Sequence, residues 1–197
     1  MELPALTGHI LGRAFDLTEA VAVAGAGVTT VVGMSAADVG AYSQPVSWNV
    51  MVAADVLTVT GPAQFVGTYF LAEAYGVNKF GDAVGVVDWT GGSGAAPFLR
   101  QTGASLAPLP MLPKASTGLA TSINDAGRIV GFQTIFQKGQ GALNRAVLWT
   151  SSTAVVDLNS QVSLGSSEKL DYAFDINTRG DILARINGNT PCLLIAK

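Results

Sequence analysis

The sequence predicts an all-β protein made of four repeats of about 50 residues, each with about four short strands. Three observations predict this class. A twelve-residue motif recurs along the chain, glycine accounts for 23 of the 197 residues, and short β-rich segments alternate with turn-forming residues. No segment has the pattern of a helix.

The motif has the form Ala-x-x-Val/Ile-Asn-x-x-Gly, followed by a short apolar strand. Its clear copies are AYGVNKFGDAVG from Ala74, ATSINDAGRIVG from Ala120 and AFDINTRGDILA from Ala173. A degenerate copy, AVAVAGAGVTTVVG, begins at Ala20 and carries Ala24 where the other copies have Asn. Four copies at this spacing nearly fill the chain, so we expect a single repeat domain over residues 1–197.

Each copy of the motif predicts a β-hairpin. Asn at the first place of a turn and Gly at the fourth are typical of a type I turn. The Asn side chain accepts a hydrogen bond from the backbone two residues on, and Gly adopts the positive φ that the turn needs. The residues assigned to these turns are Asn78, Gly81, Asn124, Gly127, Asn177 and Gly180.

A third strand follows each hairpin, as PVSW from Pro45, PFLR from Pro97, AVLW from Ala146 and PCLL from Pro191. A fourth strand is clearest in AVVDLN from Ala154. The repeats then span approximately 20–59, 74–112, 120–159 and 173–195. Four-stranded sheets repeated at this spacing are typical of propeller blades.

The last repeat stops after its third strand. The N-terminal segment RAFDLT resembles AVVDLN, so residues 13–18 are expected to complete the last blade and close the ring. Closure would remove the open strand edges that invite aggregation. Half of a larger ring completed by a second chain is one alternative, and a β-sandwich is the alternative architecture.

The repeat resembles a known family. AYGVN, ATSINDAGRIVG, RAVLW and VVDLN are similar to the HAF repeat of bacterial extracellular and surface proteins, most closely over residues 74–159. PVSW, PFLR and AVLW stand where that family has its His-Ala-Phe tripeptide. The resemblance implies propeller-like blades and assigns no catalytic residues.

Composition argues against several function classes. The net charge of −3 gives no basic excess to neutralise phosphates, so nucleic acid is not expected as a partner. With one Cys and one His, neither a thiolate metal site nor a Cys/His dyad is expected. We therefore expect no enzymatic activity, no catalytic residues, no metal and no cofactor.

Targeting signals are not recognisable in the N-terminal residues. The first 19 residues carry three acidic side chains against one Arg, which is the wrong pattern for a signal peptide. The apolar run at 20–34 is shorter than a membrane helix, so membrane insertion is not expected. These features predict cytoplasmic synthesis, compatible with a component of a virion or another large assembly.

Aromatic residues in the loops between second and third strands are the candidate ligand site. Equivalent loops of a radial repeat emerge on one face, so Tyr42, Trp89 and Phe136 are expected to lie together. Exposed aromatics on a rigid scaffold suit recognition, and a glycan is the ligand class considered. The alternative is that these side chains pack on one another.

The main functional prediction is a structural role through protein partners or self-association. Charged residues make up only 13% of the chain, and mean hydropathy is +0.39. A small repeat array cannot bury all of that apolar surface internally. The apolar segment at 65–71 is the predicted interface, with Phe65, Tyr69 and Phe70 as its candidate residues.

Overall fold

The computed structural model describes residues 4–5, 11–17, 21–23, 26–36, 43–53, 56–65, 71–88, 94–139 and 141–196. It confirms the all-β class: these residues form four separate antiparallel sheets, not the two of a sandwich. The one helical element described is the 3-10 turn η1, Leu158–Ser160. Within the described ranges no helix is long and apolar enough to cross a membrane.

Each sheet takes its strands from one stretch of the chain, in sequence order. The first sheet contains β1 (Leu11–Leu17), β3 (Ala26–Ala36), β4 (Ser43–Ala53) and β5 (Val56–Gln64), with β2 (Val21–Val23) also paired to β3. The second contains β6 (Leu71–Val77), β7 (Ala83–Asp88), β8 (Ala96–Arg100) and β9 (Ala107–Pro108). The third contains β10 (Ala115–Ile123), β11 (Ile129–Gln137), β12 (Gly141–Ser151) and β13 (Ala154–Asp157). The fourth contains β14 (Leu170–Ile176), β15 (Ile182–Ile186) and β16 (Thr190–Leu194).

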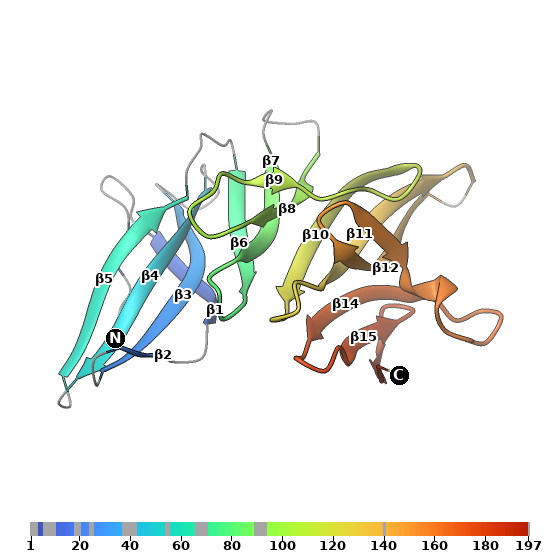
Figure 1. Cartoon of the computed structure of the whole chain (residues 1–197). Helices are drawn as coiled ribbons and strands as arrows, with labels where there is room; N and C mark the ends of the chain where they lie inside the picture. The colour runs from blue at the N-terminus through green and yellow to red at the C-terminus, as the bar shows by residue number, and fades with distance from the viewer. Residues whose placement is uncertain are drawn as a thin grey trace.

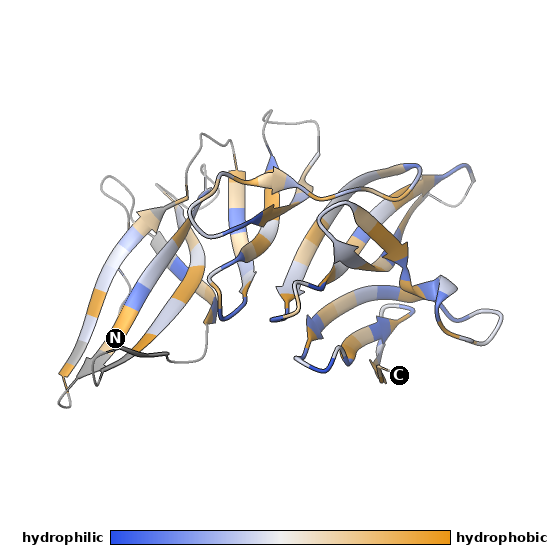
Figure 2. Cartoon of the chain, in the orientation of Figure 1, coloured by the Kyte–Doolittle hydropathy of each residue, from blue (hydrophilic) through white to orange (hydrophobic). Residues whose placement is uncertain are grey.

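The four sheets follow one another along an arc, and the first and last sheets lie at its two ends (Figure 1). The first strand of each sheet contacts the first strand of the next, so β1, β6, β10 and β14 run along the array. Apolar and polar residues are interspersed along the strands of all four sheets (Figure 2). This patterning gives every sheet an apolar face for a neighbour.

Three clusters of the hydrophobic core lie between consecutive sheets, and a fourth, of Val31, Val46 and Trp48, belongs to the first sheet alone. Val32 of the first sheet packs with residues of the second, Val84 of the second with residues of the third, and Val130 of the third with residues of the fourth. These three valines occupy the same place in their sheets. Each lies in the second strand of the motif's hairpin and directly precedes the glycine that pairs with the motif's alanine.

A β-bulge recurs in the first strand of all four sheets. The pairing register shifts after Ala14, Ala74, Ala120 and Ala173. This regularity corrects the expected start of the first repeat. Its first strand is β1, with Ala14 in the place of the motif's alanine, and not the segment that begins at Ala20.

The N-terminal strand does not complete the last sheet, contrary to the sequence prediction. β1 pairs with β3, with Ala14 opposite Gly33, as Ala74 lies opposite Gly85 in the second sheet. RAFDLT thus takes the place of a first strand of the repeat and not that of a fourth strand. Pairing within one repeat also closes a shorter loop than pairing across the whole chain, and its entropic cost is lower.

The predicted hairpin turns are confirmed in the second, third and fourth sheets. In each, the Asn side-chain oxygen accepts the backbone N–H groups two and four residues on, at 2.9–3.1 Å. The N–H of the turn glycine donates to the Asn carbonyl, and that glycine has φ between +73° and +93°. The residues concerned are Asn78, Asn124 and Asn177 with Gly81, Gly127 and Gly180.

A second glycine of the repeat is required by a close approach of two strands. A Cβ at Gly85 would lie 1.9 Å from the Glu73 carbonyl oxygen, and one at Gly131 would lie 2.0 Å from that of Leu119. The bulge brings these carbonyls onto the opposite strand, so a side chain there would force the strands apart.

Candidate functional site

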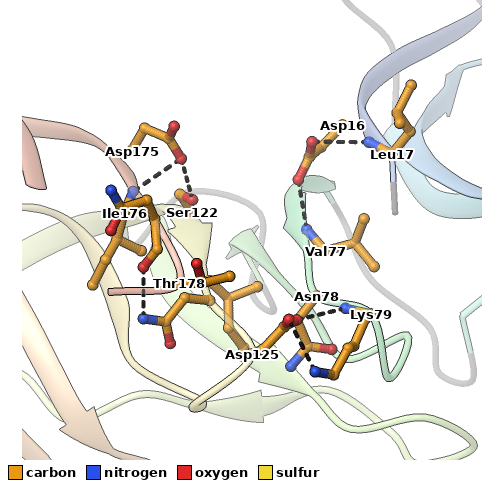
Figure 3. Close-up of a pocket in the computed structure, with 13 residues that line it drawn as sticks. Asp16, Leu17, Val77, Asn78, Lys79, Ser122, Asp125, Asp175, Ile176 and Thr178 are labelled. Atoms are coloured by element: carbon orange, nitrogen blue, oxygen red, sulfur yellow. Dashed lines mark hydrogen bonds and ion pairs between the residues drawn. The ribbon is translucent and has the colours of Figure 1, made fainter. Parts of the chain in front are cut away.

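The first-strand ends of the four sheets, with the hairpin turns of the second, third and fourth sheets, line an open cavity of about 380 Å³ (Figure 3). The first sheet contributes through the end of β1, and the other three sheets contribute through the end of the first strand and the turn that follows it. The lining residues are Asp16, Leu17, Val77, Asn78, Lys79, Ser122, Ile123, Asn124, Asp125, Asp175, Ile176, Asn177 and Thr178.

Asp16 links the first sheet to the second at the edge of this cavity. Its carboxylate accepts the backbone N–H of Val77 at 2.8 Å and that of Leu17 at 2.8 Å. Burial raises the pKa of Asp16 above its ordinary value, the two N–H donors oppose that rise, and the negative charge of Asp175 adds to it.

Asp175 links the fourth sheet to the third. Its Oδ1 accepts the hydroxyl hydrogen of Ser122 at 2.6 Å and the backbone N–H of Ile176 at 2.9 Å. Beside this pair, the Thr121 hydroxyl donates to the Ala173 carbonyl at 2.8 Å. The Ser122–Asp175 pair has no imidazole beside it among the described residues, and it acts as a hydrogen bond between sheets.

A third carboxylate, Asp125, lies on the turn of the third sheet. It accepts the backbone N–H of Lys79 at 3.1 Å and contacts the Lys79 ammonium at 3.2 Å. The hydrogen bond from the Lys79 backbone is the main reason that the pKa of Asp125 lies below its ordinary value. The cavity is therefore polar, and most of its carboxylate oxygens already bind groups that join neighbouring sheets.

The cavity lies beside the start of β11, at the opposite end of this strand from the loop that carries Phe136. Phe136 is near the tip of the β11–β12 hairpin and is 62% exposed. Tyr42 and Trp89 lie outside the described residues, so their expected cluster with Phe136 is not described by the structure. No group of three or more His, Cys, Asp or Glu in the described ranges could hold a metal ion.

The predicted interface residue Phe65 is buried, which corrects its assignment. It is 2% exposed, its ring lies 4.4 Å from the Arg100 guanidinium, and it belongs to the core between the first and second sheets. Leu109 and Leu158 follow β9 and β13 in the same way and enter the next core. An apolar residue after a fourth strand thus joins one sheet to the next. Tyr69 and Phe70 lie outside the described residues.

The exposed apolar surface of interest is instead on the fourth sheet. Leu183 occupies the place of Val32, Val84 and Val130: each faces the bulge residue two positions after the motif's alanine. Those three valines are at most 1% exposed because the next sheet covers them, whereas Leu183 is 43% exposed. Leu193, paired with Leu183, is 59% exposed. We call Leu183 and Leu193 the forward face of the fourth sheet.

The first sheet has the complementary exposed surface. Leu17 occupies the place of Val77, Ile123 and Ile176, which are 5–6% exposed in their sheets, and it is 61% exposed. Ala14 is also exposed, although its counterparts in the other sheets are fully buried. We call Ala14 and Leu17 the rear face of the first sheet.

The outer part of the first sheet is covered as in the third sheet. The Trp48 indole N–H donates to the Pro4 carbonyl at 2.8 Å, as that of Trp149 donates to the Pro110 carbonyl. Both indoles are fully buried. Among the described residues, no preceding sheet packs against Ala14 and Leu17.

These faces could have been found by carrying the repeat alignment to the ends of the chain. The motif places Leu183 in line with Val84 and Val130. The rear face was hidden because an insertion separates β1 from the part of β3 that pairs with it. Comparison of the chain with protein-family models, with curated proteins and with solved structures found no match.

Proposed function

We propose that this chain is a non-catalytic assembly module, a propeller-like array of sheets that acts through protein–protein contacts at its two ends. One observation carries the proposal. The forward face of the fourth sheet repeats a surface that, in each of the first three sheets, is covered by the sheet that follows. A stacked array needs its terminal surfaces covered or made polar to remain soluble. Here the terminal positions keep leucine.

The size of the complex in cells tests this proposal. A tagged chain in an extract of its native host is expected to elute well above monomer size. Leu193→Lys, which places a charge on the forward face, is expected to move it to monomer size. Thr153→Lys, on the exposed β12–β13 turn, is the matched control and leaves the size unchanged. Elution of the unaltered chain as a monomer would contradict the proposed function.

Ligand binding is the second candidate function, favoured by the exposure of Phe136 on the hairpin loop. In this case Tyr42, Trp89 and Phe136 would present aromatic rings to a glycan. A glycan array tests it: binding that is lost in Trp89→Ala and Phe136→Ala supports the site. If no glycan in the array binds, this candidate function is wrong.

A further inference from the structure

We propose that the forward face of the fourth sheet binds the rear face of the first sheet in a second copy of this chain. This inference rests on the proposed function and names the partner. The contact would reproduce between copies the sheet-to-sheet packing that occurs three times within the chain.

The forward face has the side chains that such packing uses. Leu183 stands in the row of Val84 and Val130, and Leu193 in the row of Leu99 and Leu148. Leu99 packs against the core between the second and third sheets, and Leu148 against that between the third and fourth. A following sheet of the same repeat is therefore the surface that fits the forward face.

The rear face has the side chains that receive such packing. The core positions of the second, third and fourth sheets combine a fully buried alanine at the bulge with a buried Val or Ile at the end of the first strand. Ala14 and Leu17 repeat this combination in the first sheet and are exposed. One chain thus carries exposed residues of both halves of the repeated interface, although Val31, Val46 and Trp48 of the first sheet are already buried.

An aromatic pair at the first strands supports the same match. Phe15 of the first sheet stacks on Tyr75 of the second, with ring centroids 4.7 Å apart. Both rings directly follow the motif's alanine, as does Phe174 in the fourth sheet. Phe174 is 40% exposed and Phe15 is 39% exposed. In the proposed contact, Phe174 would stack on Phe15 of the second copy as Phe15 stacks on Tyr75.

The contact is heterologous, because two different surfaces meet. Such contacts close into a ring when the rotation between copies allows it, and they extend into a helical assembly when it does not. In both cases each copy uses its forward face for one neighbour and its rear face for another. This property separates the proposal from a twofold contact between two forward faces.

Two single variants and their mixture test the proposal with purified protein. Leu193→Lys places a charge on the forward face, and Leu17→Lys places one on the rear face. Both side chains are exposed, so we expect both variants to fold. Circular dichroism and a dilute thermal melt check that each variant folds like the unaltered chain. Phe136→Lys, at an equally exposed aromatic outside both faces, is the control.

We expect the unaltered chain and Phe136→Lys to sediment above monomer size at micromolar concentration. Each face variant alone is expected to be monomeric, with association weakened about a hundredfold or more, as for central interface residues. An equimolar mixture of the two is expected to form a heterodimer, because one intact forward face meets one intact rear face. Leu17→Lys that still associates alone, or a mixture that stays monomeric, would overturn the proposal.

A monomeric unaltered chain at 100 µM would also overturn the second copy as partner. The proposed function would then be tested only by the elution experiment in cell extract. A large complex that is lost in Leu193→Lys would show that the partner is a different protein. Failure of both measurements would reject the proposed function and the inference together.

Discussion

At the residue scale, the Asn side chain of the hairpin turn stabilises the repeat through hydrogen bonds to backbone groups. The Asn124 side-chain oxygen accepts the N–H groups of Ala126 and Arg128 at 3.1 and 3.0 Å. Its amide nitrogen donates to the Asn177 carbonyl of the next sheet at 3.0 Å. One side chain therefore fixes a turn and ties it to its neighbour, while being only 4% exposed.

We expect Asn124→Ala to lower the free energy of unfolding by about 1–3 kcal/mol, because it leaves buried backbone groups without partners. Urea unfolding measures the change. Asn189→Ala, at an exposed Asn, is the control and should stay within about 0.5 kcal/mol of the unaltered chain. Equal effects of the two substitutions would show that the turn amide is not structurally important.

Two carboxylates of the cavity, Asp16 and Asp125, are expected to change the stability of the fold with pH in opposite directions. The pKa of Asp16 is raised in the folded state, so its ionisation disfavours folding, and stability falls as pH rises above the unfolded value of 3.8. Asp16→Asn is therefore expected to be more stable than the unaltered chain at pH 7 and nearly equal at pH 3. Urea unfolding at both pH values measures the difference.

Asp125 is the matched comparison. Its pKa is lowered, so its ionised form stabilises the fold above the unfolded value, and this stabilisation is lost as pH falls. Asp125→Asn should accordingly destabilise the chain at pH 7 and converge with it at low pH. The same sign for both variants would contradict the assigned environments.

At the element scale, the important link is the apolar residue that follows a fourth strand and enters the next core. We expect Phe65→Ala to cost about 3–5 kcal/mol, because it leaves a cavity between the first and second sheets. Phe136→Ala removes the same ring from an exposed loop and should cost less than about 0.5 kcal/mol. Thermal and urea unfolding of the two variants compare them directly; similar costs would mean that Phe65 does not join the sheets.

The sequence predicted the hairpins and third strands because their signals are local. Asn and Gly at fixed spacing specify a turn, and the apolar strand after it specifies a partner. It failed for β1 because RAFDLT matches a first-strand and a fourth-strand pattern, and only the pairing to Gly33 decides between them. It also placed Phe65 on the surface, since a run of apolar residues does not reveal whether another sheet covers it.

At the scale of the whole molecule, the sheets are neighbours in a row, and each is stabilised by its own strands and by the sheets on either side. Within the described part of the chain, the third sheet has a neighbour on each face, whereas the fourth sheet has a neighbour on one face and three strands in place of four. The structure thus predicts unequal stability along the array, lowest where the forward face is exposed.

Amide hydrogen exchange measures this inequality and its response to assembly. In Leu17→Lys, which keeps an intact forward face but is expected to be monomeric, amides of β15 and β16 should exchange faster than those of β11 and β12, because the fourth sheet opens locally. When Leu193→Lys is added to supply an intact rear face, the amides of β15 and β16 should become slower while those of β11 change little. Isotopic labelling of one variant at a time separates their signals. Protection that is equal in β11 and β15 before mixing, and unchanged after it, would show that the exposed leucines of the fourth sheet have no stabilising partner.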